Sequence, residues 1–155
     1  MNKFFLGCFL AFSFFSCSSD DGNDSGVKNE ILTGTVEGKP FTFVGGKAFD
    51  TSFNNETLLS VNLTNERADC SSTIFDYGLS ISVDVPKAVG TYNDVNIVTK
   101  DNDSQDPPFN SIGQTVEITA ISATEISGKM KLNREASTIA EASIFEGTFT
   151  VPVCE

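Results

Sequence analysis

Three aspartates in one short loop are the residues best placed to do chemistry in this sequence. Asp101, Asp103 and Asp106 alternate with other oxygen-bearing side chains in the segment DNDSQD. Side-chain oxygens on a loop are the ligands that a hard cation such as Ca²⁺ prefers. The spacing does not match an EF-hand, because Asp106 stands where the glycine should be and Ile112 where the bidentate glutamate should be. The segment is therefore a weak metal candidate, and the favoured interpretation is a solvated turn with no metal.

Other catalytic chemistry is limited by what the chain lacks. Its 155 residues contain no histidine, which excludes Ser-His-Asp, Cys-His and HExxH sites. No Gly-rich phosphate loop or CxxC pair is present, so no cofactor is expected. The net charge of −11 argues against nucleic acid as a partner. We expect a protein that is not an enzyme, with a hydrolase that uses carboxylates alone as one alternative.

The N-terminus predicts an export signal with a lipid anchor. Lys3 precedes twelve mostly apolar residues, 4–15, a run too short for a transmembrane helix but suited to a signal peptide. Ser16-Cys17 follows and resembles a bacterial lipobox, of the Phe-rich kind found in Bacteroidota lipoproteins. This resemblance implies that residues 1–16 are removed and that Cys17 carries the lipid. The alternative is an ordinary secretory peptide with an incidental Cys17, although no A-x-A cleavage site lies nearby.

Residues 17–30 predict a flexible acidic tether, because they contain almost no apolar side chain. Its first residues, Ser18, Ser19, Asp20 and Asp21, resemble the acidic export signal of Bacteroidota surface lipoproteins. That resemblance implies an outer-membrane protein that faces the cell exterior and contacts the membrane only through its lipid. The alternative is a solvated linker that happens to be acidic.

Two cysteines, Cys70 and Cys154, remain in the chain after such processing. Beyond the inner membrane the environment is oxidising, so we expect them to form a disulfide. The closed loop would hold about 85 residues, worth up to about 4.5 kcal/mol in the chain-entropy model. Two free buried thiols are the alternative.

Residues 31–155 predict a single antiparallel β domain. Apolar and polar residues alternate with a period of two, most clearly where Leu79, Ile81, Val83 and Val85 alternate with polar residues. Similar alternation marks segments near Phe41, Leu59, Val116, Ile126 and Phe145. About eight strands at intervals of roughly ten residues indicate a β-sandwich or a flattened β-barrel.

Turn residues separate these predicted strands. Gly38-Lys39-Pro40, Asn54-Asn55 and residues 122–125 indicate hairpins, and Pro86 ends the strand that starts at Leu79. The strand containing Val116 is expected to begin there, after a polar loop at 101–111. Residues 134–143 could form a short helix or a loop. Tyr77 and Tyr92 are expected to border the core with solvated hydroxyls.

Short strand motifs extend the resemblance beyond the signal. Gly38-Lys39-Pro40-Phe41, Ile126-Ser127-Gly128 and Gly147-Thr148-Phe149 are similar to motifs of small Bacteroidota lipoproteins of unknown function. The resemblance implies a location and a fold, and it brings no catalytic residues. We therefore expect a non-enzymatic lipoprotein that binds an envelope protein or has a structural role. The further alternative is a lipocalin-like barrel that holds a small apolar ligand.

Overall fold

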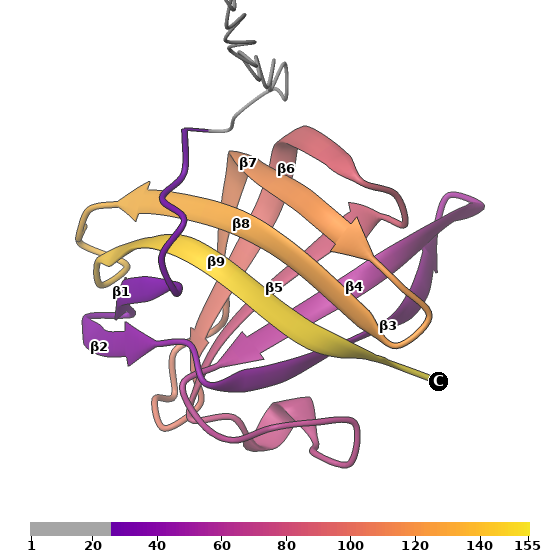
Figure 1. Cartoon of the computed structure of the whole chain (residues 1–155). Coiled ribbons are helices and arrows are strands. Elements are labelled where there is room, and N and C mark those ends of the chain that lie inside the picture. The colour runs from indigo at the N-terminus through magenta and orange to yellow at the C-terminus, as the bar shows by residue number, and fades with distance from the viewer. Residues whose placement is uncertain (1–25) are drawn as a thin grey trace, which may run out of the picture.

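The protein folds as an all-β domain, seen in a computed structural model that describes residues 26–155 (Figure 1). The described part contains one short 3-10 turn, η1, and nine strands. Their bounds are β1 Thr33–Val36, β2 Lys39–Thr42, β3 Gly45–Phe53, β4 Glu56–Thr64, η1 Ile74–Asp76, β5 Leu79–Pro86, β6 Gly90–Asp101, β7 Phe109–Ile121, β8 Glu125–Arg134 and β9 Ser143–Cys154. None of the described residues forms a helix long and apolar enough to cross a membrane.

The sheet closes into a barrel, which decides between the two predicted architectures. The strand order is β2-β1-β9-β3-β4-β5-β6-β7-β8, and β8 also pairs with β9, so seven strands from β3 to β9 form a closed ring (Figure 1). The last strand, β9, makes this closure possible. Its first half pairs with β1, its second half pairs in parallel with β3 at Ala48↔Val153 and Phe49↔Cys154, and its other edge pairs with β8.

The predicted alternation places every second side chain of a strand inside the barrel. Leu59, Val61 and Leu63 of β4 are fully buried, as are Ile81 and Val85 of β5. The same periodicity on the remaining strands completes one continuous buried cluster, to which every strand contributes. Burial of these apolar side chains is the main force that holds the strands in register, because a slip of one residue would expose each of them.

Two predicted boundaries need correction. Strand β7 begins at Phe109, seven residues before Val116, because residues 109–115 continue the ladder with β6. Its first half was missed because the outward residue Ile112 is apolar and the inward residue Ser111 is polar, which hides the alternation. Residues 135–142 form the loop between β8 and β9, so the alternative of a short helix at 134–143 is wrong.

The hairpin formed by β1 and β2 packs over one end of the barrel. Val36 and Phe41 are buried in the common core, and β1 contacts β5 and β6 as well as its ladder partner β9. The tight turn at Glu37-Gly38 has both residues at positive φ, which glycine adopts easily and glutamate does not. Contacts of the Glu37 side chain with the barrel must therefore hold this residue in place.

Candidate functional site

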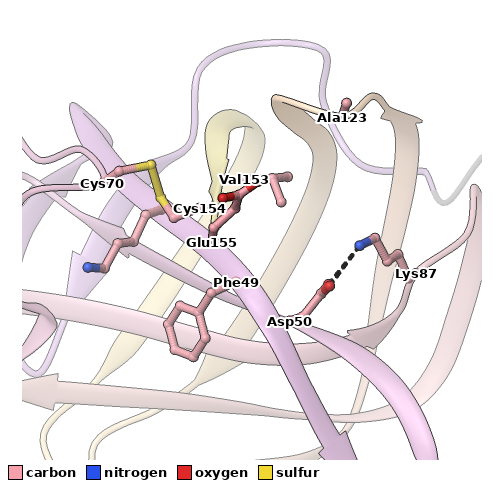
Figure 2. A pocket seen from close by; sticks show the side chains of 9 residues that line it. Phe49, Asp50, Cys70, Lys87, Ala123, Val153, Cys154 and Glu155 are labelled. Atoms are coloured by element: carbon pink, nitrogen blue, oxygen red, sulfur yellow. Dashed lines mark hydrogen bonds and ion pairs between the residues drawn. A yellow bond between two sulfur atoms is a disulfide. The ribbon is translucent and has the colours of Figure 1, made fainter.

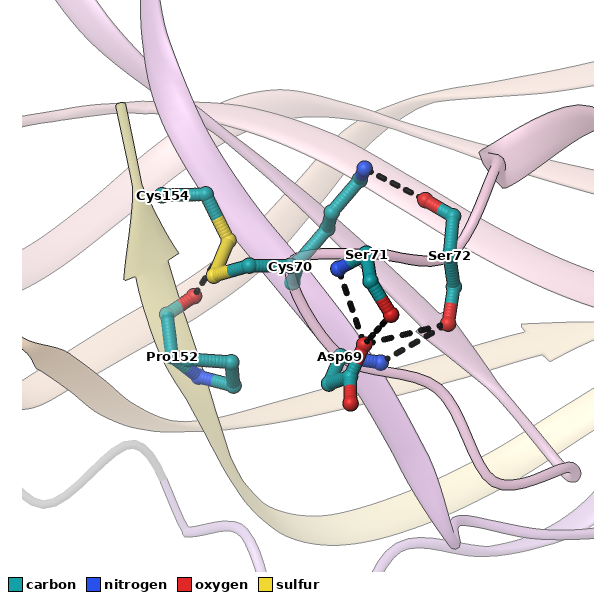
Figure 3. Close-up of a disulfide and its surroundings, with 7 residues drawn as sticks. Asp69, Cys70, Ser71, Ser72, Pro152 and Cys154 are labelled. Atoms are coloured by element: carbon teal, nitrogen blue, oxygen red, sulfur yellow. Dashed lines mark hydrogen bonds between the residues drawn. A yellow bond between two sulfur atoms is a disulfide. The ribbon is translucent and has the colours of Figure 1, made fainter.

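The disulfide between Cys70 and Cys154 is formed, as predicted (Figure 3). The two residues are 84 positions apart, their Cα atoms are separated by 5.5 Å, and Cys70 is exposed. The bond joins the loop between β4 and β5 to the end of β9. Next to it, the Asp69 carboxylate accepts hydrogen bonds from the Ser71 hydroxyl and amide and from the Ser72 hydroxyl. These bonds, those of Ser71 above all, lower the pKa of Asp69.

A pocket of about 720 Å³ lies beside this disulfide, and we call it the mouth pocket (Figure 2). It is lined by Lys47, Phe49, Asp50, Cys70, Lys87, Ala123, Val153, Cys154 and Glu155. Its two lysines are already engaged by the protein. Lys87 Nζ lies 2.8 Å from Asp50 Oδ1, and Lys47 Nζ donates to the Ser72 carbonyl at 2.6 Å. The mouth pocket therefore combines apolar surface with two engaged lysines and the acidic residue Glu155.

A second pocket, of about 570 Å³, lies in the barrel wall between β5 and β6, and we call it the wall groove. It is lined by Phe53, Leu58, Ser82, Val83, Asp84, Pro86, Tyr92, Asn93, Asp94, Val95, Asn96 and Val98. Phe53, at the tip of the hairpin between β3 and β4, is 68% exposed. Within residues 26–155, no ion pair or side-chain hydrogen bond engages the carboxylate of Asp84 or Asp94. The wall groove thus combines exposed aromatic surface with two carboxylates that have no such partner among the described residues.

Neither pocket shows an activated nucleophile. In the described part of the chain, no hydroxyl or thiol in either pocket donates a hydrogen bond to a carboxylate, as a nucleophile with a general base would. The Tyr92 hydroxyl donates to the Ala88 carbonyl at 2.8 Å, and both cysteines of the mouth pocket are in the disulfide.

The three aspartates of the candidate cation site do not converge on a common point. Asp101 Oδ2 lies 2.7 Å from Lys39 Nζ, and Asp103 Oδ2 lies 3.9 Å from the same ammonium. Asp106 instead accepts a hydrogen bond from the Ser104 hydroxyl. The bond to Asp101 raises the pKa of Lys39 above its ordinary value. Among residues 26–155, no group of three or more potential ligands is placed to hold a metal ion. Within the segment the Asp103 amide donates to the Asp101 carboxylate at 3.2 Å, and the ion pair with Lys39 ties β2 to the end of β6.

A buried polar cluster that the sequence did not suggest holds the β1–β2 turn against the barrel. Glu37 Oε1 accepts hydrogen bonds from Arg134, Thr99 and Ser143, which come from three different strands. The Arg134 guanidinium also lies 3.9 Å from the centre of the Phe109 ring. The only signal in the sequence was a charged residue at the end of a predicted strand, which is common on any surface. The cluster fastens the β1–β2 turn to three strands, and among the described residues only the Arg134 Nε is buried in it without a hydrogen-bond partner.

The expectation for Tyr77 is wrong. Its side chain is buried, with 3% exposed, and its hydroxyl has no hydrogen-bond partner among the described residues. Burial, and to a smaller extent the negative charge of Asp69, raise the pKa of Tyr77 above 10.0. Tyr92 does border the core, with its hydroxyl at the surface.

The predicted lipid site Cys17 and the predicted export signal Ser18, Ser19, Asp20 and Asp21 lie outside the described residues. The comparisons with known proteins add no assignment: no family model, no curated protein and no solved structure matches this chain.

Proposed function

We propose that the protein is a lipid-anchored protein of the bacterial cell envelope whose barrel binds a protein partner through its outer surface, without catalysing a reaction. Acylated Cys17 is the anchor. The predicted tether, 17–30, is shorter than expected at its far end, because Val27 is buried and Lys28 pairs with Glu146 of β9. The acidic residues 18–21 direct the domain to the outer face of the outer membrane. Membrane contact is made by the lipid alone.

The single observation that carries the binding mode is the filled interior of the barrel. Leu59, Ile81, Ile97, Ile118 and Met130 are fully buried and pack in one cluster with the other inward-facing side chains. A lipocalin-like barrel needs a central cavity wide enough for a ligand. Because side chains occupy this interior, a partner would bind in the outer pockets, which favours surface binding over the lipocalin-like alternative.

The disulfide supports the location. Cys70 is exposed, and a surface disulfide persists in an oxidising compartment but is reduced in the cytosol. The sequence between Met1 and Cys17 supplies the matching export signal. The two features are independent, since one concerns export and the other concerns the folded domain.

The anchor is tested by substituting its cysteine in the full chain expressed in a bacterium. Wild-type protein should be processed and should enter the detergent phase on phase separation. The variant Cys17→Ala should remain an unprocessed precursor. Cys8→Ala is the matched control and should behave as wild type. Cys17→Ala protein that is processed to the same size and stays membrane-bound would refute the anchor.

Surface display is tested with a specific protease site inserted directly after Gly22, ahead of the buried Val27, so that cleavage does not depend on unfolding the barrel. Added protease should release the domain from intact cells. Asp20→Ala with Asp21→Ala should protect the protein until the cells are lysed, whereas Asp24→Ala should not. Wild-type protein that is cleaved only after lysis would argue for a periplasmic location.

A further inference from the structure

The wall groove exists because the ladder between β5 and β6 stops early. The pairs run from Leu79↔Asp101 to Val83↔Ile97, although both strands continue beyond that point. Continuing the register would place Asp84 opposite Asn96 and Pro86 opposite Asp94, yet in the described structure neither pair forms. On their other edges β5 pairs with β4 and β6 pairs with β7. Two strand edges therefore face each other across the groove without pairing.

Two residues explain why the strands separate. Pro86 has no N–H group, so it cannot donate to a neighbouring strand. Asp94 has a φ of 60°, a left-handed conformation that interrupts β6, and the ladder with β7 shifts register at the same place. The split is thus built into the backbone of both strands.

Local hydrogen bonds also keep the end of this hairpin open. The Ala88 amide donates to the Pro86 carbonyl at 2.8 Å, which folds the connection on itself. The Tyr92 hydroxyl donates to the Ala88 carbonyl, so the tyrosine side chain bridges within the turn. These contacts satisfy the turn without closing the gap between Asp84 and Asn96.

A second gap in the barrel wall, between β7 and β8, has a segment of the chain packed beside it. That ladder begins at Val116↔Met130, and a smaller pocket of about 280 Å³ lies where it stops. There the N-terminal segment packs beside the gap: Val27 lines the pocket and is only 7% exposed. The wall groove, in contrast, is lined only by the strands and hairpin that form it.

The lining of the wall groove selects the kind of occupant. It contains Asp84 and Asp94 and no lysine or arginine, so it favours a positively charged partner. Phe53, Leu58 and Pro86 provide apolar surface beside these carboxylates. An extended peptide presents side chains alternately to two faces and main-chain groups at its edges. A segment that alternates basic and apolar residues would match the charges, the apolar surface and the unpaired edges together.

We propose that the wall groove binds an extended basic segment of the partner protein, which pairs with the free edge of β5 or β6 as an added strand. This inference deepens the proposed function by naming the site and the chemistry of the partner. It rests on the binding role but not on the lipid anchor, because the contact needs no membrane.

The test uses the full chain purified in detergent and three capped heptapeptides as probes. The first alternates lysine and valine, the second alternates glutamate and valine, and the third is the first with alternate amides N-methylated. Calorimetry should show binding of the lysine peptide, with the other two at least about tenfold weaker, since lost charge-assisted or main-chain bonds each cost about 1.5 kcal/mol. NMR should place the shifts at the amides of residues 84–85 and 93–96.

Matched variants locate the charge effect. Asp84→Asn with Asp94→Asn should weaken the lysine peptide by about tenfold or more, and asparagine tolerates the left-handed backbone at position 94. Glu125→Gln, which changes an exposed carboxylate of β8 outside the groove, should leave the affinity unchanged.

Three results would overturn the proposal: equal binding of the lysine and glutamate peptides, no effect of N-methylation, or no binding. So would shifts of the same amides by maltohexaose or chitohexaose in place of the peptide, which would indicate a glycan site. Because the assay contains no membrane, a failed anchor experiment leaves this result unaffected.

Discussion

Glu37 and Arg134 form an ion pair across the end of the barrel, although 97 residues separate them. Both side chains are mostly buried, with 15% and 13% exposed. The pair joins the β1–β2 turn to the end of β8, and the guanidinium rests on the ring of Phe109. It holds Glu37 in its positive-φ conformation and fastens the hairpin over the core.

Removal of one partner from this pair should strongly destabilise the domain. We expect Arg134→Gln to lower the free energy of unfolding by about 2–4 kcal/mol, because it leaves the Glu37 carboxylate buried without its counter-charge. Arg134→Lys should recover only part of the loss, since an ammonium cannot reproduce the forked hydrogen bonds and the ring contact. Urea unfolding measures both. A double-mutant cycle with Glu37→Gln should give a coupling energy above about 1 kcal/mol, and additive losses would show that the pair contributes little.

The disulfide should contribute a large share of the stability. Reduction, or Cys70→Ser with Cys154→Ser, removes a covalent link that closes a loop of about 85 residues and is worth up to about 4.5 kcal/mol. The melting temperature should fall by about 10 °C or more, since one kcal/mol corresponds to about 3–6 °C in a domain of this size. Calorimetry with and without reductant makes the comparison. Thiol labelling of the denatured, unreduced protein should find Cys70 and Cys154 unreactive, and labelling of both would contradict the bond.

Ionisation of Tyr77 should be coupled to unfolding at alkaline pH. Its folded-state pKa is raised above 10.0 by burial, so the folded state holds its proton more tightly than the unfolded chain. The resulting stability is complete below pH 10 and is lost as the pH rises toward and through the folded-state pKa. In Tyr92→Phe, Tyr77 is the only tyrosine left, so tyrosinate absorbance reports it alone. We expect it to titrate above pH 10 when folded and at about 10 in urea. Identical titrations would show that the phenol is solvated.

The close approach of β1 to β9 should make position 34 intolerant of any side chain. A Cβ at Gly34 would lie 2.6 Å from the Phe145 Cα and even closer to the Ile144 carbonyl oxygen. Both are backbone atoms that cannot move aside. Gly34→Ala should cost about 2–4 kcal/mol from the combined clash and backbone strain. Gly113→Ala is the matched control, because it also has a positive φ but nothing within 4 Å of the added carbon. It should cost about 1 kcal/mol, from strain alone. Equal losses in urea unfolding would show that the contact at Gly34 relaxes.

Period-two alternation was sufficient to predict the all-β class and most of the strands. The inward positions of β4, β5, β8 and residues 145–151 of β9 follow directly from it, because in a strand with one wet face each residue's side is determined by its neighbours. The turns at Gly38, Asn54-Asn55 and residues 122–125 also follow from local chemistry. The pairing of Cys70 with Cys154 follows from counting the cysteines that would remain after the predicted processing.

Tertiary structure alone decided how these strands pair. Alternation says which face of a strand is buried but not which strand lies beside it. It therefore could not show that β9 changes partner from β1 to β3 and closes a barrel in place of a sandwich. The Glu37–Arg134 pair, the burial of Tyr77 and the wall groove all depend on residues brought together from distant positions. The wall groove also depends on the early end of the ladder between β5 and β6. Only the backbone path of these two strands determines where their pairing ends.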